Sequence, residues 1–143
     1  MRSSVLARVI NFESAGKERN RLVRLVSYAL RELMLRKTID PETKDLAAFV
    51  TLSLERIGNT IDNSVNAWEK RGYWVKADHF RNEWKWSIEI SQQMKQALIV
   101  EDWGQFRQQL ALVAGKLSHI KIPKRRNRDK PWNGLWKKFS DLR

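Results

Sequence analysis

Residues capable of acid–base or metal chemistry are few in this chain, and they do not form a catalytic set. His79 and Glu83 are four residues apart, so on a helix both could face one metal ion, but no second carboxylate–histidine pair completes a site. A hydrogen bond along the helix surface is the more ordinary interpretation. The sequence has no cysteine, no glycine-rich phosphate loop and no nucleophile elbow. We therefore expect a protein that is not an enzyme and has no cofactor and no metal site.

Phosphate binding is the chemistry that the sequence favours. The net charge is +12, and most of it lies at the two ends of the chain. Residues 2–37 carry nine basic and three acidic residues, and residues 121–143 carry nine basic and two acidic residues. Charge segregated in this way attracts polyanions, although solubility alone is an alternative explanation.

Two groups of residues are candidates for contacts with nucleic acid. The first shares one face of an expected helix and consists of Lys17, Arg21, Arg24, Tyr28 and Arg31. Guanidinium groups contact phosphates, and an aromatic ring among them can stack on an unpaired base. A solvated outer helix face is the alternative explanation for this group. The second group is a basic run near the C-terminus, formed by Lys124, Arg125, Arg126, Arg128 and Lys130.

Large apolar residues follow the basic run at helical spacing. They are Trp132, Leu135, Trp136 and Phe139, at i, i+3, i+4 and i+7. This spacing predicts a short helix over residues 131–139 that packs on the rest of the protein, because burial of two tryptophans stabilises docking. The preceding basic residues would then form a loop that is held at both ends.

Apolar residues recur at helical spacing almost throughout the chain, and no segment has the sustained alternation of a strand. A first helix is expected to end near Lys37. A second helix is expected to start with Asp40 as its N-cap and Pro41 in its first turn, and to end before Gly72. A third helix follows at once, and a fourth is expected to start at Asp102 as its cap and to run to about residue 120.

The expected connections between these four helices are only a few residues long. Short connections force consecutive helices to pack antiparallel. We therefore expect an all-α protein whose residues 1–120 form an up-down-up-down four-helix bundle. Residues 121–143 are expected to be a basic, Trp-containing tail that docks on the bundle.

The expected third helix has more apolar residues than one core face needs. Its core face is predicted to contain Tyr73, Ala77, Phe80, Trp84, Ile88 and Leu98. A second stripe includes Val75, His79, Trp86 and Ile90, with Trp86 pointing away from Trp84. An exposed apolar stripe usually marks an interface. Either a second copy of the protein or its own tail, through Trp132, Trp136 and Phe139, could cover this stripe.

A small, basic four-helix bundle with an aromatic third helix resembles the accessory variability proteins of diversity-generating retroelements. It is also similar to the bundles encoded by 23S rRNA intervening sequences. The resemblance covers the segments from "YWVKADHFRNEWKWSI" through "FRQQLALVAGKL", and the matching positions include Ala77, Asp78, Trp86, Ala114 and Gly115. It implies a non-enzymatic homo-oligomer that binds RNA and a protein partner.

The sequence thus predicts a largely non-specific nucleic-acid-binding bundle, with RNA ahead of DNA, that acts as an accessory or assembly subunit. One alternative is a protein-interaction or oligomeric scaffold subunit that uses the aromatic stripe of the third helix. Another is binding to a membrane surface through "PWNGLWKKF". No window approaches the ~18 apolar residues of a membrane span, and the first residues lack the pattern of a signal peptide. We therefore expect a soluble, cytoplasmic protein.

Overall fold

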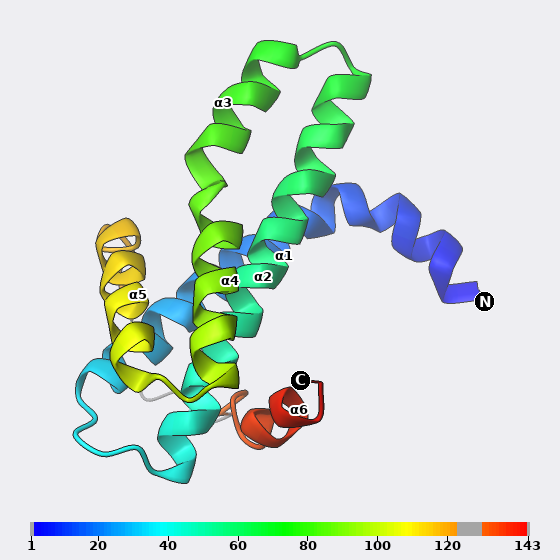
Figure 1. Cartoon of the computed structure of the whole chain (residues 1–143). Coiled ribbons are helices and arrows are strands. Elements are labelled where there is room, and N and C mark those ends of the chain that lie inside the picture. The colour runs from blue at the N-terminus through cyan, green and yellow to red at the C-terminus, as the bar shows by residue number, and fades with distance from the viewer. Residues whose placement is uncertain (1, 123–129, 143) are drawn as a thin grey trace.

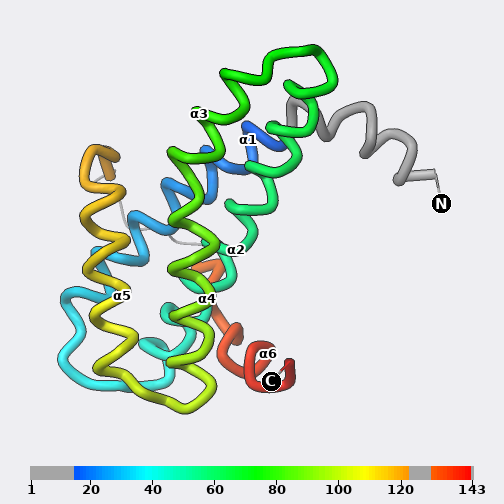
Figure 2. Tube along the Cα trace, turned by 45° about the horizontal axis from the view of Figure 1, so that its top comes forward, coloured from blue at the N-terminus to red at the C-terminus, as the bar shows by residue number. Residues whose placement is uncertain are grey.

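Helices make up most of the described chain (Figures 1 and 2). The structure, a computed structural model, describes residues 2–122 and 130–142, with side chains from Ala15 onward. No strand occurs among these residues, so the predicted all-α class is confirmed. The helices are α1 (Arg2–Met34), α2 (Pro41–Lys70), α3 (Trp74–Trp84), α4 (Trp86–Ile99), α5 (Trp103–Lys116) and α6 (Leu135–Leu142).

Helix α2 is the central element, because α1, α3, α4 and α6 all pack against it. Its start is fixed locally, since Asp40 Oδ1 accepts a hydrogen bond from Thr43 N at 2.7 Å and Pro41 occupies the first turn. It ends before Gly72, whose φ of 84° lies in the left-handed region that favours glycine. The boundaries predicted for this helix are confirmed.

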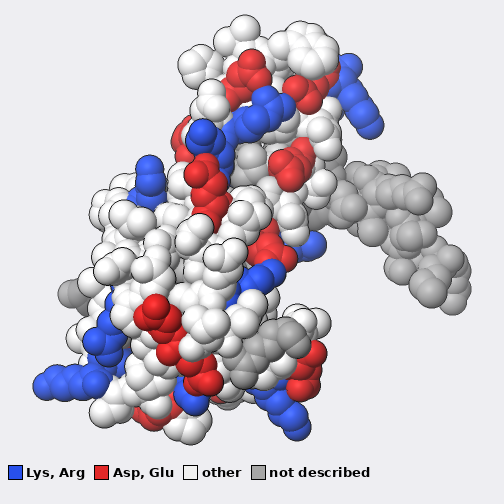
Figure 3. Space-filling model, in the orientation of Figure 1, with Lys and Arg blue, Asp and Glu red and all other residues white. Residues whose placement is uncertain are grey.

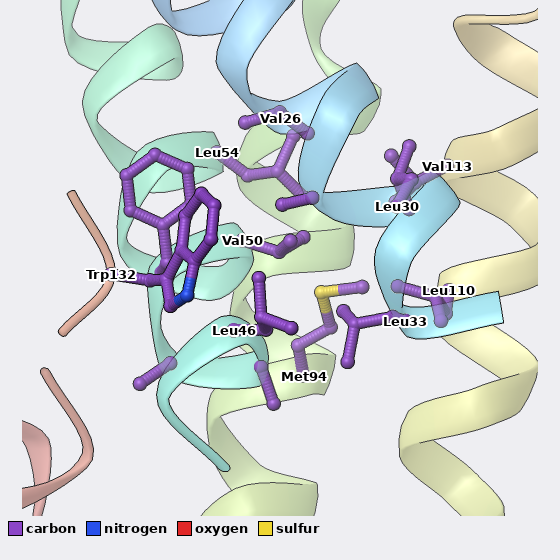
Figure 4. Close-up of a cluster of buried hydrophobic side chains, with 14 of the residues drawn as sticks. Val26, Leu30, Leu33, Leu46, Val50, Leu54, Met94, Leu110, Val113 and Trp132 are labelled. Atoms are coloured by element: carbon purple, nitrogen blue, oxygen red, sulfur yellow. The ribbon is translucent and has the colours of Figure 1, made fainter. Parts of the chain in front are cut away.

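The main core lies where α1, α2, α4 and α5 meet (Figure 4). Helix α2 runs antiparallel to the α3–α4 pair, α1 crosses them obliquely, and α5 lies beside α4 (Figures 1 and 2). Apolar side chains that recur at helical spacing along α1 and α2 are buried, except for the half-buried Trp68 at the end of α2. The buried ones are Leu22, Val26, Ala29, Leu33, Leu46, Val50, Leu54, Ile57, Ile61 and Val65. A smaller cluster of Ile61, Val65 and Ala77 holds α3 against the second half of α2.

The third predicted helix is divided into two, α3 and α4, at Lys85. Trp84 and Trp86 stack there, with ring centroids 5.7 Å apart and planes inclined by 24°. In an unbroken helix, side chains two residues apart point in different directions and cannot stack. Two rings that the prediction had placed on separate faces therefore lie in contact at this interruption.

Helices α2 and α4 approach each other closely at Gly58. A β-carbon built on Gly58 would lie 2.1 Å from Ile88 Cδ1 and 2.3 Å from Ile88 Cγ1. Real side chains do not come this close, so the contact requires either glycine or a shift of Ile88. The absence of a side chain at this position lets the two helices pack at their present distance.

The last two helices differ from the prediction at their ends. Asp102 caps α5 as expected, since its carboxylate accepts from Gln105 N at 3.1 Å, but α5 ends at Lys116 rather than near residue 120. Helix α6 begins at Leu135 rather than directly after Pro131. Residues 131–134 form turns instead, with φ of 79° at Gly134. This glycine conformation delays the start of the helix.

Candidate nucleic-acid interface

Three cations of the predicted α1 stripe lie on the surface. Lys17, Arg21 and Arg24 are exposed, and among the described residues none of them bonds to a carboxylate. The other charges of this part of α1 are occupied, because Glu18 pairs with Arg56 of α2 and Arg19 is directed into the protein. These three residues, called the α1 basic stripe from here on, are therefore available to an anionic ligand.

Arg19 has a structural role instead. Its guanidinium lies 4.8 Å from the centroid of the Phe80 ring and donates to Ser64 Oγ at 3.3 Å. Burial lowers the pKa of this half-buried group. Arg19 thus joins the middle of α1 to the arm formed by α2 and α3.

Tyr28 does not lie beside the cations as an exposed ring. It is only 7% exposed and stacks on Trp132, with ring centroids 5.9 Å apart and planes inclined by 23°. Arg31 lies over the same ring, with Cζ 4.9 Å from its centroid, and is half-buried. The expectation that Tyr28 stacks on a base is therefore wrong for this conformation, because Trp132 already covers the ring.

The tail packs on the protein through the aromatic residues that were predicted to dock. Trp132 is 2% exposed and enters the core beside Phe49, from the side opposite Leu110 and Val113 (Figure 4). Phe139 is also buried, and the half-buried Trp136 contacts Trp103 at a centroid distance of 5.8 Å. Because these rings are covered, "PWNGLWKKF" does not present the apolar face needed to bind a membrane.

Two carboxylates near the start of α2 hold the tail in place. Glu42 accepts from Lys130 Nζ at 3.2 Å and from Trp132 Nε1 at 3.5 Å. Hydrogen bonding from Arg36, at 2.5 Å, is the main reason that the pKa of Glu42 is below its ordinary value. Asp45 accepts from the backbone N–H groups of Gly134 at 3.1 Å and Trp136 at 2.9 Å. Asp45 therefore supplies the N-terminal cap of α6 from another helix.

The basic run before the tail can be placed only in part. Lys124, Arg125, Arg126 and Arg128 lie outside the described residues. Lys130 is exposed but forms an ion pair with Glu42, so its charge is partly satisfied within the protein. The described chain stops at Ile122 and resumes at Lys130, next to Trp132 and hence next to Tyr28 of α1.

The predicted second stripe of the third helix does not receive the tail. Val75 and His79 are exposed, Trp86 is half-buried against Trp84, and Ile90 is buried in the main core. The tail packs instead on α2, with rings against α1 and α5. The expectation that the stripe docks the tail is wrong, because Asp45 and Glu42 bind the tail at the other end of α2.

Sequence reasoning missed two features of the surface. The first is the pair of carboxylates Glu42 and Asp45, which bind the tail across about 90 residues of sequence, a separation that leaves no local signal. The second is the turn between α2 and α3, where Tyr73 is 54% and Trp74 60% exposed. Helical spacing had assigned Tyr73 to the core, but it precedes the first residue of α3. Adjacent aromatic residues directly after Gly72 were a signal for this turn.

The described residues contain no group of three His, Asp or Glu side chains that could hold a metal ion. Within the same part of the chain, no helix is both long enough and apolar enough to span a membrane. Comparison with known proteins gives no relatives: no family model, curated protein or solved structure matches this chain.

Proposed function

We propose that this chain is a non-enzymatic, cytoplasmic nucleic-acid-binding protein, with RNA as the more suitable ligand, built as an up-down-up-down four-helix bundle with a docked tail. It contacts phosphates through the α1 basic stripe and through the run from Lys124 to Lys130. It acts as an accessory or assembly subunit, the role that its resemblance to retroelement accessory proteins implies.

The observation that supports this proposal best is the stacking of Tyr28 on Trp132. These residues belong to the two most basic segments of the chain, and their rings are 5.9 Å apart. Arg24 and Arg21 precede Tyr28 by about one and two helical turns, respectively, and Lys130 is two residues before Trp132. The stack therefore joins the helix that carries the α1 basic stripe to the start of the tail, which supports binding of one ligand by both segments.

Binding measurements at several salt concentrations test this proposal. A labelled single-stranded RNA should bind with an affinity that falls at least about tenfold between 50 and 200 mM salt, because phosphate contacts release counterions. Replacing Arg21 and Arg24 by glutamine should reduce the slope of log affinity against log salt by about 1.4, since each phosphate contact with a single strand contributes about 0.7. Fluorescence anisotropy is a suitable measurement.

The matched control replaces Arg107 and Lys116 by glutamine. Both side chains are exposed on α5, so this variant removes the same charge from a different surface. Equal weakening by the two pairs would mean that net charge, and not the α1 basic stripe, governs binding. Wild-type affinity that does not respond to salt would contradict the proposal as a whole.

A protein-interaction or oligomeric scaffold is a second candidate. The surface that favours it is a groove on another part of the protein and not the stripe predicted on the third helix. A groove of about 270 Å³ lies between α1 and the end of α5, with Leu30, Met34, Leu35 and Leu117 in its walls. Met34 is 65% and Leu35 is 70% exposed there. Light scattering after size exclusion tests this candidate: a monomer at micromolar concentrations that also captures no partner would count against it.

A further inference from the structure

The turn between α2 and α3 carries an exposed apolar patch at one end of the molecule (Figures 1 and 2). Tyr73 is 54% exposed, Trp74 60% and Val75 72%. All seven tryptophans are described, and the other six are buried or half-buried. Trp74 is thus the one indole that the fold leaves in solvent, on a turn that the main core does not reach.

The backbone that carries these rings is held on both sides. Tyr73 N donates to Trp68 O at 2.9 Å, Gly72 N to Glu69 O at 3.0 Å, and Ala77 N to Tyr73 O at 3.0 Å. Below the turn, Trp68 packs edge-on against Phe80 with centroids 4.8 Å apart. The aromatic pair therefore projects from a defined support, which reduces the ordering needed when a ligand binds.

Cations surround the patch, and its nearest carboxylates are occupied. Lys70, Arg71 and Lys76 are exposed, and Lys76 Nζ lies 4.5 Å from the centroid of the Trp68 ring. Arg81 binds Glu69 at 3.0 Å and Asp78 at 2.6 Å, so its one positive charge partly offsets the negative charge of these two carboxylates. Figure 3 shows uncharged atoms at the end of the molecule formed by the turn between α2 and α3, with basic and acidic side chains next to them.

We propose that this turn binds unpaired bases. Tyr73 and Trp74 stack on the bases, and Lys70 and Lys76 contact the neighbouring phosphates. Exposed aromatic rings with adjacent cations are the combination that recognises single-stranded nucleic acid, since every base offers a face for stacking. This inference rests on the proposed function and deepens it, because it specifies single strands or loops as the ligand in preference to a continuous duplex.

Helix α1 contacts the part of α2 that leads to this turn. Arg19, two residues from both Lys17 and Arg21, bonds to Ser64 on α2. Eight residues of helix and turn separate Ser64 from Gly72, a distance of about 12 Å at 1.5 Å per residue. Helix α1 therefore meets α2 little more than two helical turns away from the exposed rings.

Stacking fits the patch better than a protein or lipid partner does. Three side chains cannot supply the ~800 Å² per partner of a typical stable protein interface. A lipid-binding helix needs a continuing apolar face, whereas α3 next exposes Asp78, His79, Arg81 and Glu83. Bases need only the ring faces and the nearby cations.

Three variants at Tyr73 and Trp74 separate stacking from simple apolar contact. The ligands are a single-stranded oligouridylate, an abasic strand of equal length and charge, and an RNA duplex. The double variant Tyr73→Ala/Trp74→Ala should bind oligouridylate about tenfold more weakly than the wild type does. Its affinities for the abasic strand and for the duplex should equal those of the wild type. Trp74→Phe should retain most of the affinity, and Trp74→Leu should lose it, because leucine keeps apolar bulk but has no aromatic face.

Leu112→Ala is the matched control, since Leu112 is 54% exposed on α5. Melting temperatures should be equal in all these variants. Unchanged oligouridylate affinity in the double variant would overturn the inference, and so would equal affinity of Trp74→Phe and Trp74→Leu. Loss of binding to anionic phosphatidylserine vesicles, with oligouridylate binding intact, would show that the turn serves a membrane instead.

The same measurements distinguish this inference from the proposed function. If Arg21 and Arg24 matter for every ligand but the aromatic pair does not, the inference fails and the proposed function stands. If only the aromatic pair matters, the turn binds nucleic acid and the α1 basic stripe does not. Wild-type protein that binds none of the three ligands would refute both.

Discussion

Two segments of this chain combine tryptophan with neighbouring lysine or arginine, and they lie at opposite ends of α2. The tail segment, residues 130–139, buries Trp132 and Phe139 beside the first turns of α2. The turn segment, residues 70–76, leaves Tyr73 and Trp74 in solvent at the other end (Figure 1). Similar residue types are therefore buried in one segment and exposed to solvent in the other.

Spacing and local partners account for the difference. In the tail, Leu135, Trp136 and Phe139 lie at helical spacing on α6, Trp132 precedes that helix, and Glu42 and Asp45 accept hydrogen bonds from this segment. In the turn, the two rings are adjacent in sequence and Tyr73 precedes the first residue of α3, so the pair is not part of a helical face that packs on the core. Aromatic composition alone thus does not distinguish a core residue from a ligand-binding one.

The largest expected contrast is between Trp132→Ala and Trp74→Ala. Loss of the Trp132 ring should lower the free energy of unfolding by about 3–5 kcal/mol, because it removes a large buried side chain and leaves Tyr28 and Phe49 uncovered. Loss of the Trp74 ring should change it by less than about 0.5 kcal/mol. Urea denaturation of the two variants measures both values, and equal losses would contradict the comparison.

A smaller effect is expected at Asp45. Asp45→Ala removes the acceptor for Gly134 N and Trp136 N, and the loss of a helix cap costs about 1 kcal/mol. Asp78→Ala is the matched control, because Asp78 is an exposed carboxylate that bonds Arg81 near the turn. The control should destabilise the protein less than Asp45→Ala does. Thermal unfolding of both variants tests this order.

The smallest effect is the response of the tail to acid. Because the folded-state pKa of Glu42 is lowered, mainly by the hydrogen bond from Arg36, its carboxylate contributes stability above the ordinary value of 4.5. This contribution is lost as the pH falls through the folded-state pKa, and solvent screening limits it to less than about 1 kcal/mol. Melting temperatures from pH 6 to pH 3.5 should therefore fall more steeply in the wild type than in Glu42→Gln.

Asp40 remains in both of these proteins, and its pKa is also lowered, chiefly by the Thr43 hydroxyl. The difference between the two pH profiles therefore isolates Glu42. Parallel profiles would show that Glu42 does not couple the tail to pH.

Features with local causes could be predicted from the sequence, and features with distant causes could not. Asp40, Pro41 and Gly72 define the ends of α2 by their own backbone preferences, so its boundaries were predicted correctly. The interruption at Lys85 has no proline or glycine to signal it. Among candidate site residues, Lys17, Arg21 and Arg24 are exposed as expected, but burial of Tyr28 depends on Trp132, which is 104 residues away.

The cap that Asp45 gives to α6 has a consequence for the order of folding. An eight-residue helix is too short to be stable alone in water, and this one takes its N-terminal hydrogen-bond acceptor from a residue about 90 positions earlier. Helix α6 should therefore form only after α2 is in place, as the last step of folding. Until then the apolar site around Tyr28 and Phe49 is uncovered, so a growing or refolding chain is most prone to aggregate just before its tail docks.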